Sequence, residues 1–258
     1  MNRKRFRPRR FFPLIFGMLL PLAQAFVAHP ADPLESPQWD LMHKTFLGGE
    51  PVVFDERVRL LAPATAENAM AVPVWLDAQD VGPVDRIVVV ADLNPLPKVL
   101  EFKPGEAAPR LGFKVKIQQA TPVRVAARTR DGVWHVGGRW IDAAGGGCTA
   151  PSVASGNRDW ADRLGEIHAR LWRKDSGGRR LKFSLMHPMD TGLAAGIPAF
   201  YAETVQVLGE NDNLIAEILP LEPVAENPLF TLDLPRQSAV RLVGRDNNGN
   251  VFKSGRIQ

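Results

Sequence analysis

The chain of 258 residues contains one cysteine, Cys148. A single cysteine excludes an internal disulfide, although exported domains commonly use paired cysteines as crosslinks. A lone thiol in an oxidising compartment is open to unwanted oxidation unless it is buried or used. Cys148 is therefore the first residue whose presence needs a reason.

The familiar catalytic sequence patterns are also absent. The chain has no G-x-S-x-G elbow, P-loop, dinucleotide fingerprint, C-x-x-C or H-E-x-x-H. Its five histidines are scattered, so we expect no catalytic residue, no metal and no cofactor. His187 precedes Pro188 at a strand end, which favours a histidine that fixes a turn. Asp131, Asp190 and Asp246 stand beside turns or glycines and are interpreted as turn formers.

The first 25 residues have the composition of an export signal. Residues 1–10 hold six basic and no acidic side chains, and an apolar run follows from Phe11 to Leu22. This run is too short to span a bilayer comfortably, and Ala23-Gln24-Ala25 has the small-x-small pattern of a signal peptidase site. Arg9-Arg10 resembles a twin-arginine signal, which leaves both the Sec and the twin-arginine routes open. We expect residues 1–25 to be cleaved, the product to be periplasmic, and no stable membrane insertion after cleavage.

Removal of this segment changes the charge of the protein. The remaining chain holds 26 basic and 28 acidic residues, a net charge of −2. The basic excess of the whole chain therefore belongs to the signal. No basic patch for nucleic acid is indicated, and we expect no nucleic-acid partner.

The pattern of apolar residues predicts mostly strands. A lead-in at 26–37 is Pro-rich and predicted to be flexible, and one short helix follows from Trp39 to Leu47. Beyond it, apolar and polar residues alternate with period two, as where Phe113, Val115 and Ile117 alternate with Lys114, Lys116 and Gln118. Turn pairs such as Asp131-Gly132 and Asn248-Gly249 separate the runs. This spacing predicts an all-β protein of two immunoglobulin-like β-sandwich domains.

A segment of small residues separates the two β regions and contains the cysteine. We predict a Gly-rich linker at 145–160, between sandwiches at 26–144 and 161–258, with a short helical turn before the next strand. Gly145, Gly146 and Gly147 precede Cys148 and Thr149 follows it, so the segment is slim and we expect an exposed thiol. Two readings remain open from these residues, a covalent attachment point and an incidental linker cysteine.

Five stretches of the first half form a recognisable set: Leu61-Ala62-Pro63, Ala66-Glu67-Asn68-Ala69, Val72-Pro73-Val74, Asp92-Leu93-Asn94-Pro95-Leu96-Pro97 and Gly146-Gly147-Cys148. In these stretches the first half resembles SoxY, a carrier of bacterial sulfur oxidation. The second half resembles SoxZ at His187-Pro188-Met189-Asp190-Thr191-Gly192, Ile197-Pro198-Ala199 and Asn227-Pro228-Leu229-Phe230. The whole is similar to a fused SoxY–SoxZ carrier.

The resemblance implies a non-catalytic periplasmic carrier of thiosulfate oxidation. It implies that Cys148 bears the sulfur intermediates, while Gly145, Gly146, Gly147 and Thr149 form the carrier arm. The partners implied are a haem-containing loading enzyme, a hydrolase and a sulfur dehydrogenase.

Three departures from the family leave other functions open. Thr149 and Ala150 replace glycines, Asp190 stands where SoxZ typically has Glu, and the arm continues into the second domain. One alternative is a SoxYZ-like module beside a quinoprotein (PQQ) dehydrogenase, with different cargo or a thiol-independent binding role. A thiol-dependent hydrolase is a third hypothesis, and it requires His135, His168 or His187 to approach Cys148 in space.

Overall fold

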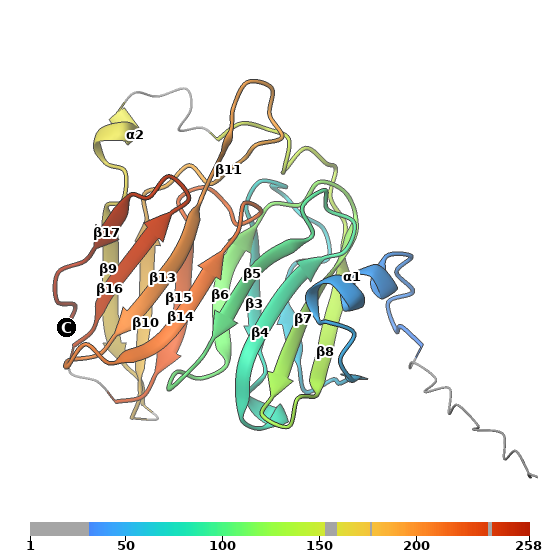
Figure 1. Ribbon diagram of the computed structural model, residues 1–258, viewed down its shortest axis with the longest axis horizontal. Helices are drawn as coiled ribbons and strands as arrows, with labels where there is room; N and C mark the ends of the chain where they lie inside the picture. The colour runs from blue at the N-terminus through green and yellow to red at the C-terminus, as the bar shows by residue number, and fades with distance from the viewer. Residues whose placement is uncertain (1–30, 153–158, 176, 237–238) are drawn as a thin grey trace, which may run out of the picture.

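The computed structural model describes residues 31–152, 159–175, 177–236 and 239–258. The predicted export signal at 1–25 and part of the predicted linker, 153–158, lie outside the described residues. Strands dominate what is described, and they form layered sheets (Figure 1). The prediction of an all-β fold is confirmed. Within the described residues, no helix is long and apolar enough to cross a bilayer.

The first half follows the predicted alternation closely. Its elements are α1 (Trp39–Phe46), β1 (Val52–Phe54), β2 (Arg59–Leu61), β3 (Val72–Asp77), η1 (Gln79–Val81), β4 (Val84–Ala91), β5 (Lys98–Lys103), β6 (Arg110–Val115), β7 (Thr121–Thr129) and β8 (Trp134–Ile141). The predicted Asp131-Gly132 turn joins β7 to β8, with Gly132 at φ +87°. That backbone angle is open to glycine at little cost.

The second half begins with the predicted short helical turn and strand. Its elements are α2 (Asp159–Asp162), β9 (Ile167–Arg173), β10 (Arg179–Leu185), β11 (Asp190–Thr191), β12 (Ala199–Phe200), β13 (Ala202–Leu208), β14 (Leu214–Pro220), β15 (Leu229–Leu234), β16 (Arg241–Asp246) and β17 (Val251–Lys253). The Asn248-Gly249 turn joins β16 to β17, as predicted.

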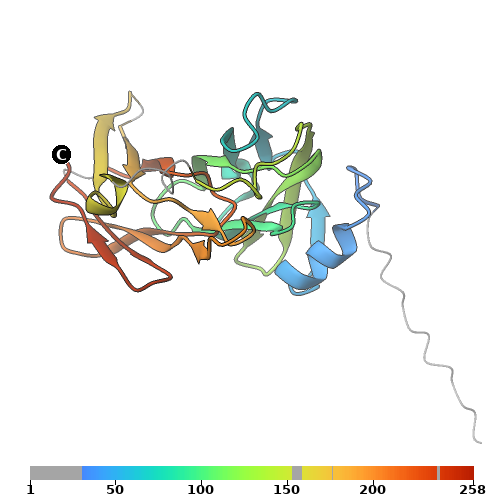
Figure 2. The same ribbon diagram turned by 90° about the horizontal axis from the view of Figure 1, so that it is seen from above.

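Both main sheets run through the two halves without a break. The nine-stranded sheet has the order β1-β8-β7-β4-β5-β14-β13-β16-β17, and the six-stranded sheet β2-β3-β6-β15-β10-β9. The halves meet where β5 pairs with β14 and β6 pairs with β15, both antiparallel. Viewed from above, the halves lie side by side in one elongated molecule (Figure 2). One cluster of buried apolar side chains spans both, so the halves are joined by shared sheets as well as by the linker.

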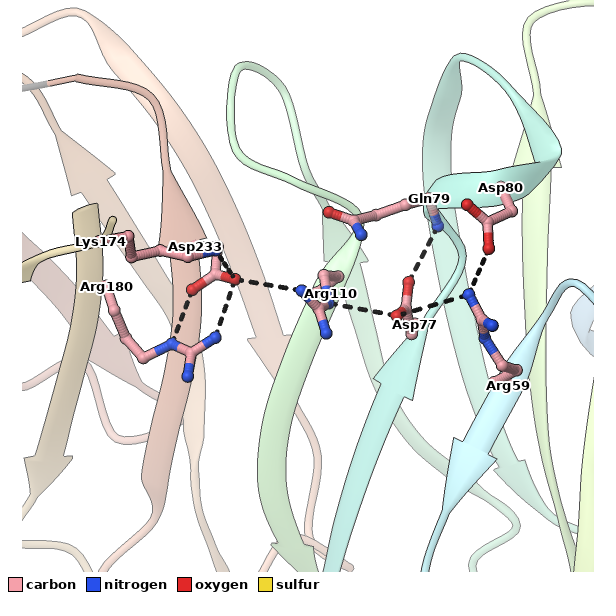
Figure 3. Close-up of polar contacts among 8 residues, drawn as sticks. All are labelled: Arg59, Asp77, Gln79, Asp80, Arg110, Lys174, Arg180 and Asp233. Atoms are coloured by element: carbon pink, nitrogen blue, oxygen red, sulfur yellow. Dashed lines mark hydrogen bonds and ion pairs between the residues drawn. The ribbon is translucent and has the colours of Figure 1, made fainter. Parts of the chain in front are cut away.

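A chain of ion pairs crosses this seam on the outer face of the six-stranded sheet (Figure 3). Asp233, on β15, is 3% exposed and pairs with Lys174 at 2.6 Å and Arg180 at 2.8 Å. Arg110, on β6, then bridges Asp233 at 3.4 Å and Asp77 at 3.3 Å. Burial alone raises the pKa of Asp233, but the hydrogen bonds from Arg180 and Lys174 outweigh burial and lower it. The ionised carboxylate thus fastens the second half to the first.

The lead-in predicted to be flexible is held down where it is described. Asp32 accepts two hydrogen bonds from the guanidinium of Arg124, at 2.8 and 2.6 Å. Arg124 is 1% exposed, also pairs with Asp92 at 2.9 Å, and lies 4.5 Å from the ring of Trp39. A buried guanidinium needs such partners. The expectation of flexibility is therefore wrong from Asp32 onward, because α1 and its approach cover the outer face of the nine-stranded sheet.

Candidate functional site

Cys148 lies in a turn after β8, and its side chain is fully buried. The thiol donates a weak hydrogen bond to the carbonyl oxygen of Lys116 at 3.6 Å. The expectation of an exposed thiol is therefore wrong. In Figure 1 the connection that contains Cys148 crosses one end of the sandwiches.

The glycines explain why the segment is docked. A Cβ on Gly147 would lie 2.2 Å from the carbonyl oxygen of Ala69 and 2.5 Å from that of Ile117. Only glycine allows the backbone to approach so closely. Gly145 and Gly146 adopt φ of +107° and +87°, which L side chains avoid. The predicted slimness of the arm is thus used to fit the chain against β6 and its continuation.

Both halves of the protein hold the docked turn. The N–H of Cys148 donates to Gln118 Oε1 at 3.1 Å, and the N–H of Gly147 donates to the Ile117 carbonyl at 3.2 Å. From the second half, the Thr191 hydroxyl donates to the carbonyl oxygen of Cys148 at 2.6 Å. Thr149 is exposed, and its hydroxyl lies 3.4 Å from Gln118 Oε1. The buried Cys148 is thus followed directly by a residue that is exposed at the surface.

The structure brings together stretches that are far apart in sequence around Cys148. Ala69 accepts a hydrogen bond from the N–H of Ile117 at 2.8 Å, beside Gly147. Asn94 donates to the Lys116 carbonyl at 2.8 Å and accepts from the Gln118 N–H at 2.9 Å. Ala69 and Asn94 come from stretches whose sequence resembles SoxY, and Thr191 comes from the stretch for which a resemblance to SoxZ is predicted.

Sequence reasoning missed Lys116, which lies beside the thiol. Its alternation with apolar neighbours predicted a surface residue, yet it is 3% exposed. Its ammonium donates to the carbonyl oxygens of Met189 and Glu222, the latter at 3.1 Å. Burial lowers the pKa of Lys116 to about 8. The second half covers the residue, and the sequence of β6 alone contains no sign of that cover.

Burial also decides the chemistry of the docked thiol. It raises the pKa of Cys148 to about 11, and the nearby cation of Lys116 only partly opposes that rise. A thiol with this pKa is protonated at neutral pH, and the thiolate is the nucleophile. The docked position therefore stores the cysteine in an unreactive form.

Asp131 and Asp246, interpreted from the sequence as turn formers, have that role. The Asp131 carboxylate accepts from the Thr129 hydroxyl and the Val133 N–H, and Asp246 accepts from the N–H groups of Asn248 and Asn250. Asp190, in contrast, lies in β11 and caps no turn of the described chain. Its carboxylate accepts from the N–H of Ser152 at 3.1 Å, which ties the chain after Cys148 to the second half.

His187 fixes a turn, as interpreted. Its Nδ1 accepts from the N–H of Met189 at 3.1 Å, and its ring lies 4.5 Å from that of Phe200. The side chain is buried, and burial lowers its pKa to about 4, against the opposing effect of Asp246 at 3.6 Å. It is therefore neutral at pH 7.

The histidines do not supply a base for the thiol. His135 pairs with Asp55 at 2.7 Å, and His168 pairs with Glu166 at 3.0 Å. In the described part of the chain, neither these nor His187 hydrogen-bonds to Cys148, so the geometry does not favour the hydrolase hypothesis. The same residues contain no group of three side chains placed to hold a metal ion.

Comparison with known proteins agrees with the resemblance of the first half. Residues 43–148 match the family model described as "Sulfur oxidation protein SoxY". This part of the chain is SoxY-like. The match ends on Cys148 itself and does not extend to the second half, where the resemblance to SoxZ stays a prediction.

Two solved structures are similar to parts of this chain. The sulfur carrier protein SoxY from Chlorobium limicola f thiosulfatophilum is 18% identical over 42% of this chain and 96% of its own, with a TM-score of 0.36. A tetra-tandem repeat in the extending region of a large adhesion protein is 14% identical over 78% of this chain and 49% of its own, with a TM-score of 0.25. No curated protein matches the chain.

Proposed function

We propose that this protein is a non-catalytic carrier that binds sulfur-compound intermediates covalently on Cys148 and presents them to partner enzymes. The observation that carries the proposal is the SoxY match that ends on Cys148, the only cysteine in the chain. The convergence of Ala69, Asn94 and Thr191 around this residue supports it. The export signal predicted at 1–25 supports a periplasmic location.

Loading thiosulfate would form a sulfur–sulfur bond to the Cys148 thiol. The thiol loses its proton, the sulfane sulfur of thiosulfate becomes bonded to Sγ, and two electrons leave. A haem-containing loading enzyme would accept those electrons. The docked thiol is buried and protonated. The turn that contains Cys148 must therefore detach from the residues that bury it before this bond can form.

Intact-mass analysis of protein from thiosulfate-grown cells tests the attachment. We expect adducts that a reductant removes and that Cys148→Ser lacks, because serine does not form the sulfur–sulfur bond. Thr149→Ser serves as the matched control, since it changes the neighbouring residue and keeps the thiol. Unmodified wild-type protein under these conditions, with a Cys148→Ser strain that grows on thiosulfate normally, contradicts the proposal.

A second candidate is a binding module associated with a quinoprotein dehydrogenase, with other cargo or no use of the thiol. The burial of Cys148 and its high pKa favour the form of this candidate that does not use the thiol, because such a module has no need of an accessible sulfur. It predicts that capture of the dehydrogenase is unchanged in Cys148→Ser. Loss of capture in that variant contradicts it.

The location is tested by cell fractionation. We expect the mature protein in the periplasmic fraction, starting near Phe26. Substitution of Arg9 and Arg10 by lysine distinguishes the routes, because only twin-arginine export depends on that pair.

A further inference from the structure

The outer face of the second half carries a cationic groove that the carrier proposal does not use. The groove has a volume of about 700 Å³ and lies over β9, β10 and β15. Its outward-facing lining consists of His168, Arg170, Trp172, Lys182, Ser184 and Leu229. We call these residues the cationic groove.

Two cations of the groove are direct neighbours. In the β9–β10 register Arg170 pairs with Lys182, and both side chains are exposed on the same face. Opposed residues of an antiparallel pair have Cβ atoms about 5 Å apart, and like charges there are destabilising. Among the described residues, neither Arg170 nor Lys182 forms an ion pair. The fold therefore gains no stability from placing these two cations opposite each other.

The neighbouring cations on the same sheet are different. Arg180, Lys174 and Arg110 are all paired with Asp233, as Figure 3 shows. Glu166, which directly precedes β9, pairs with His168 and Arg163. The charges of Arg170 and Lys182 are thus available to a binding partner. They form a local cationic patch on a protein whose net charge, without residues 1–25, is −2.

Trp172 gives the groove an apolar anchor. It is 41% exposed and stands beside Arg170 on β9, facing the same side. Tryptophan and arginine are the residue types that most often dominate binding energy at protein interfaces. Two cations beside one tryptophan are too few for a nucleic-acid backbone, where affinity rests on many phosphate contacts.

We infer that the cationic groove is a docking surface for a partner protein that presents carboxylates around an apolar side chain. The carboxylates complement Arg170 and Lys182, and the apolar side chain packs on Trp172. The surface is separate from Cys148, so this inference holds whatever the thiol carries.

Binding of a defined peptide tests the inference on the full mature chain. The probe is a fluorescent peptide of Glu-Glu-Leu-Glu-Glu repeats, with a Gln-for-Glu peptide as its neutral counterpart. We expect the acidic peptide to bind, and Arg170→Gln with Lys182→Gln to weaken binding roughly ten-fold. The matched control is Lys44→Gln with Lys253→Gln, which removes the same charge from exposed sites outside the groove. Equal weakening in both double variants overturns the inference.

Two further measurements separate docking from other causes. Trp172→Ala should weaken peptide binding several-fold at fixed salt, whereas unspecific charge attraction leaves it unchanged. Arg170→Gln should raise the Tm by about 1–2 °C through relief of like-charge repulsion. A fall in Tm shows that the charges serve the fold and overturns the inference. So does groove-dependent binding of anionic vesicles, of a DNA duplex or of a second copy in place of the peptide.

Discussion

The hydroxyl of Thr191, in the second half, donates a 2.6 Å hydrogen bond to the carbonyl oxygen of Cys148, at the end of the first. This bond crosses the seam and holds the turn that buries the thiol. The reactivity of Cys148 is therefore governed by a contact between the halves. The rate at which a thiol-specific reagent labels Cys148 reports how often the turn is released from its buried position.

Thr191→Val should raise the rate of thiol labelling roughly five-fold at pH 7. The substitution removes a hydrogen bond worth about 1 kcal/mol, which raises the population of the released turn by that factor. Thr149→Val is the matched control, because among the described residues its exposed hydroxyl makes only the long contact with Gln118. Thr191→Ser should restore the wild-type rate. An unchanged rate in Thr191→Val contradicts the role of this bond.

Gly147→Ala should release the turn almost completely. The added methyl would meet the carbonyl oxygens of Ala69 and Ile117 at 2.2 and 2.5 Å, and backbone atoms cannot yield as a flexible side chain can. Labelling of Cys148 should then approach the rate of a free thiol, with a loss of about 1–3 kcal/mol in stability. Gly255→Ala is the control, since a Cβ there meets nothing within 4 Å. Slow labelling in Gly147→Ala would show that the turn stays docked.

The pH dependence of labelling should differ between the docked and released turns. A released thiol titrates near 8.5, so its labelling rate levels off above that pH. In the wild type the docked thiol has a pKa of about 11, so raising the pH above 8.5 also favours release. Its rate should keep rising through pH 8.5, while that of Gly147→Ala levels off. A plateau near 8.5 in both proteins is the opposing result.

Stability should fall as the pH drops from about 6.5 to 4, because of His187. Its folded pKa of about 4 lies below the ordinary value, so the unfolded chain takes up the proton first. We expect a loss of roughly 1–2 kcal/mol between pH 7 and 5 in urea unfolding, less in His187→Asn. His168→Asn, at an exposed site, should retain the wild-type slope. Lowered carboxylate pKa values, such as that of Asp233, act below pH 4.

Asp233→Asn should destabilise both halves together. The substitution leaves Lys174 and Arg180 without their counter-charge, whereas Arg110 keeps its pair with Asp77. Because these cations are partly exposed, we expect a cost of about 1–3 kcal/mol. Because both sheets and the core run through the seam, we expect one unfolding transition, shifted to lower urea. Glu203→Gln, in an exposed pair with Arg245, should shift it by less than about 1 kcal/mol. Two separate transitions would show that the halves unfold independently.

The sequence predicted the strands well, because alternation records which side of a strand faces the core. It missed β5, which has Pro97 before it and Pro104 after it, and whose Glu101 is buried by pairing with Arg86 and Lys98. Those ion pairs depend on side chains that meet only after folding. The pairing of β5 with β14 joins residues more than a hundred positions apart, and no local pattern encodes it.

The site was predicted by residue but not by environment. Cys148 stood out because it is the only cysteine and follows three glycines. Its burial was missed because small residues build no core of their own, while here Ile117, Gln118 and Thr191 supply the cover. Lys116 was missed for the same reason. The alternation of polar and apolar residues around it describes only the first half, and the second half buries it.

The shared sheets have a consequence for the contacts that bury Cys148. Gln118 holds the turn from one side of the seam and Thr191 from the other, and one polypeptide supplies both. An assembly of separate subunits falls apart on dilution, whereas linked halves keep a constant effective concentration. The extent to which the thiol is covered is therefore independent of the protein concentration.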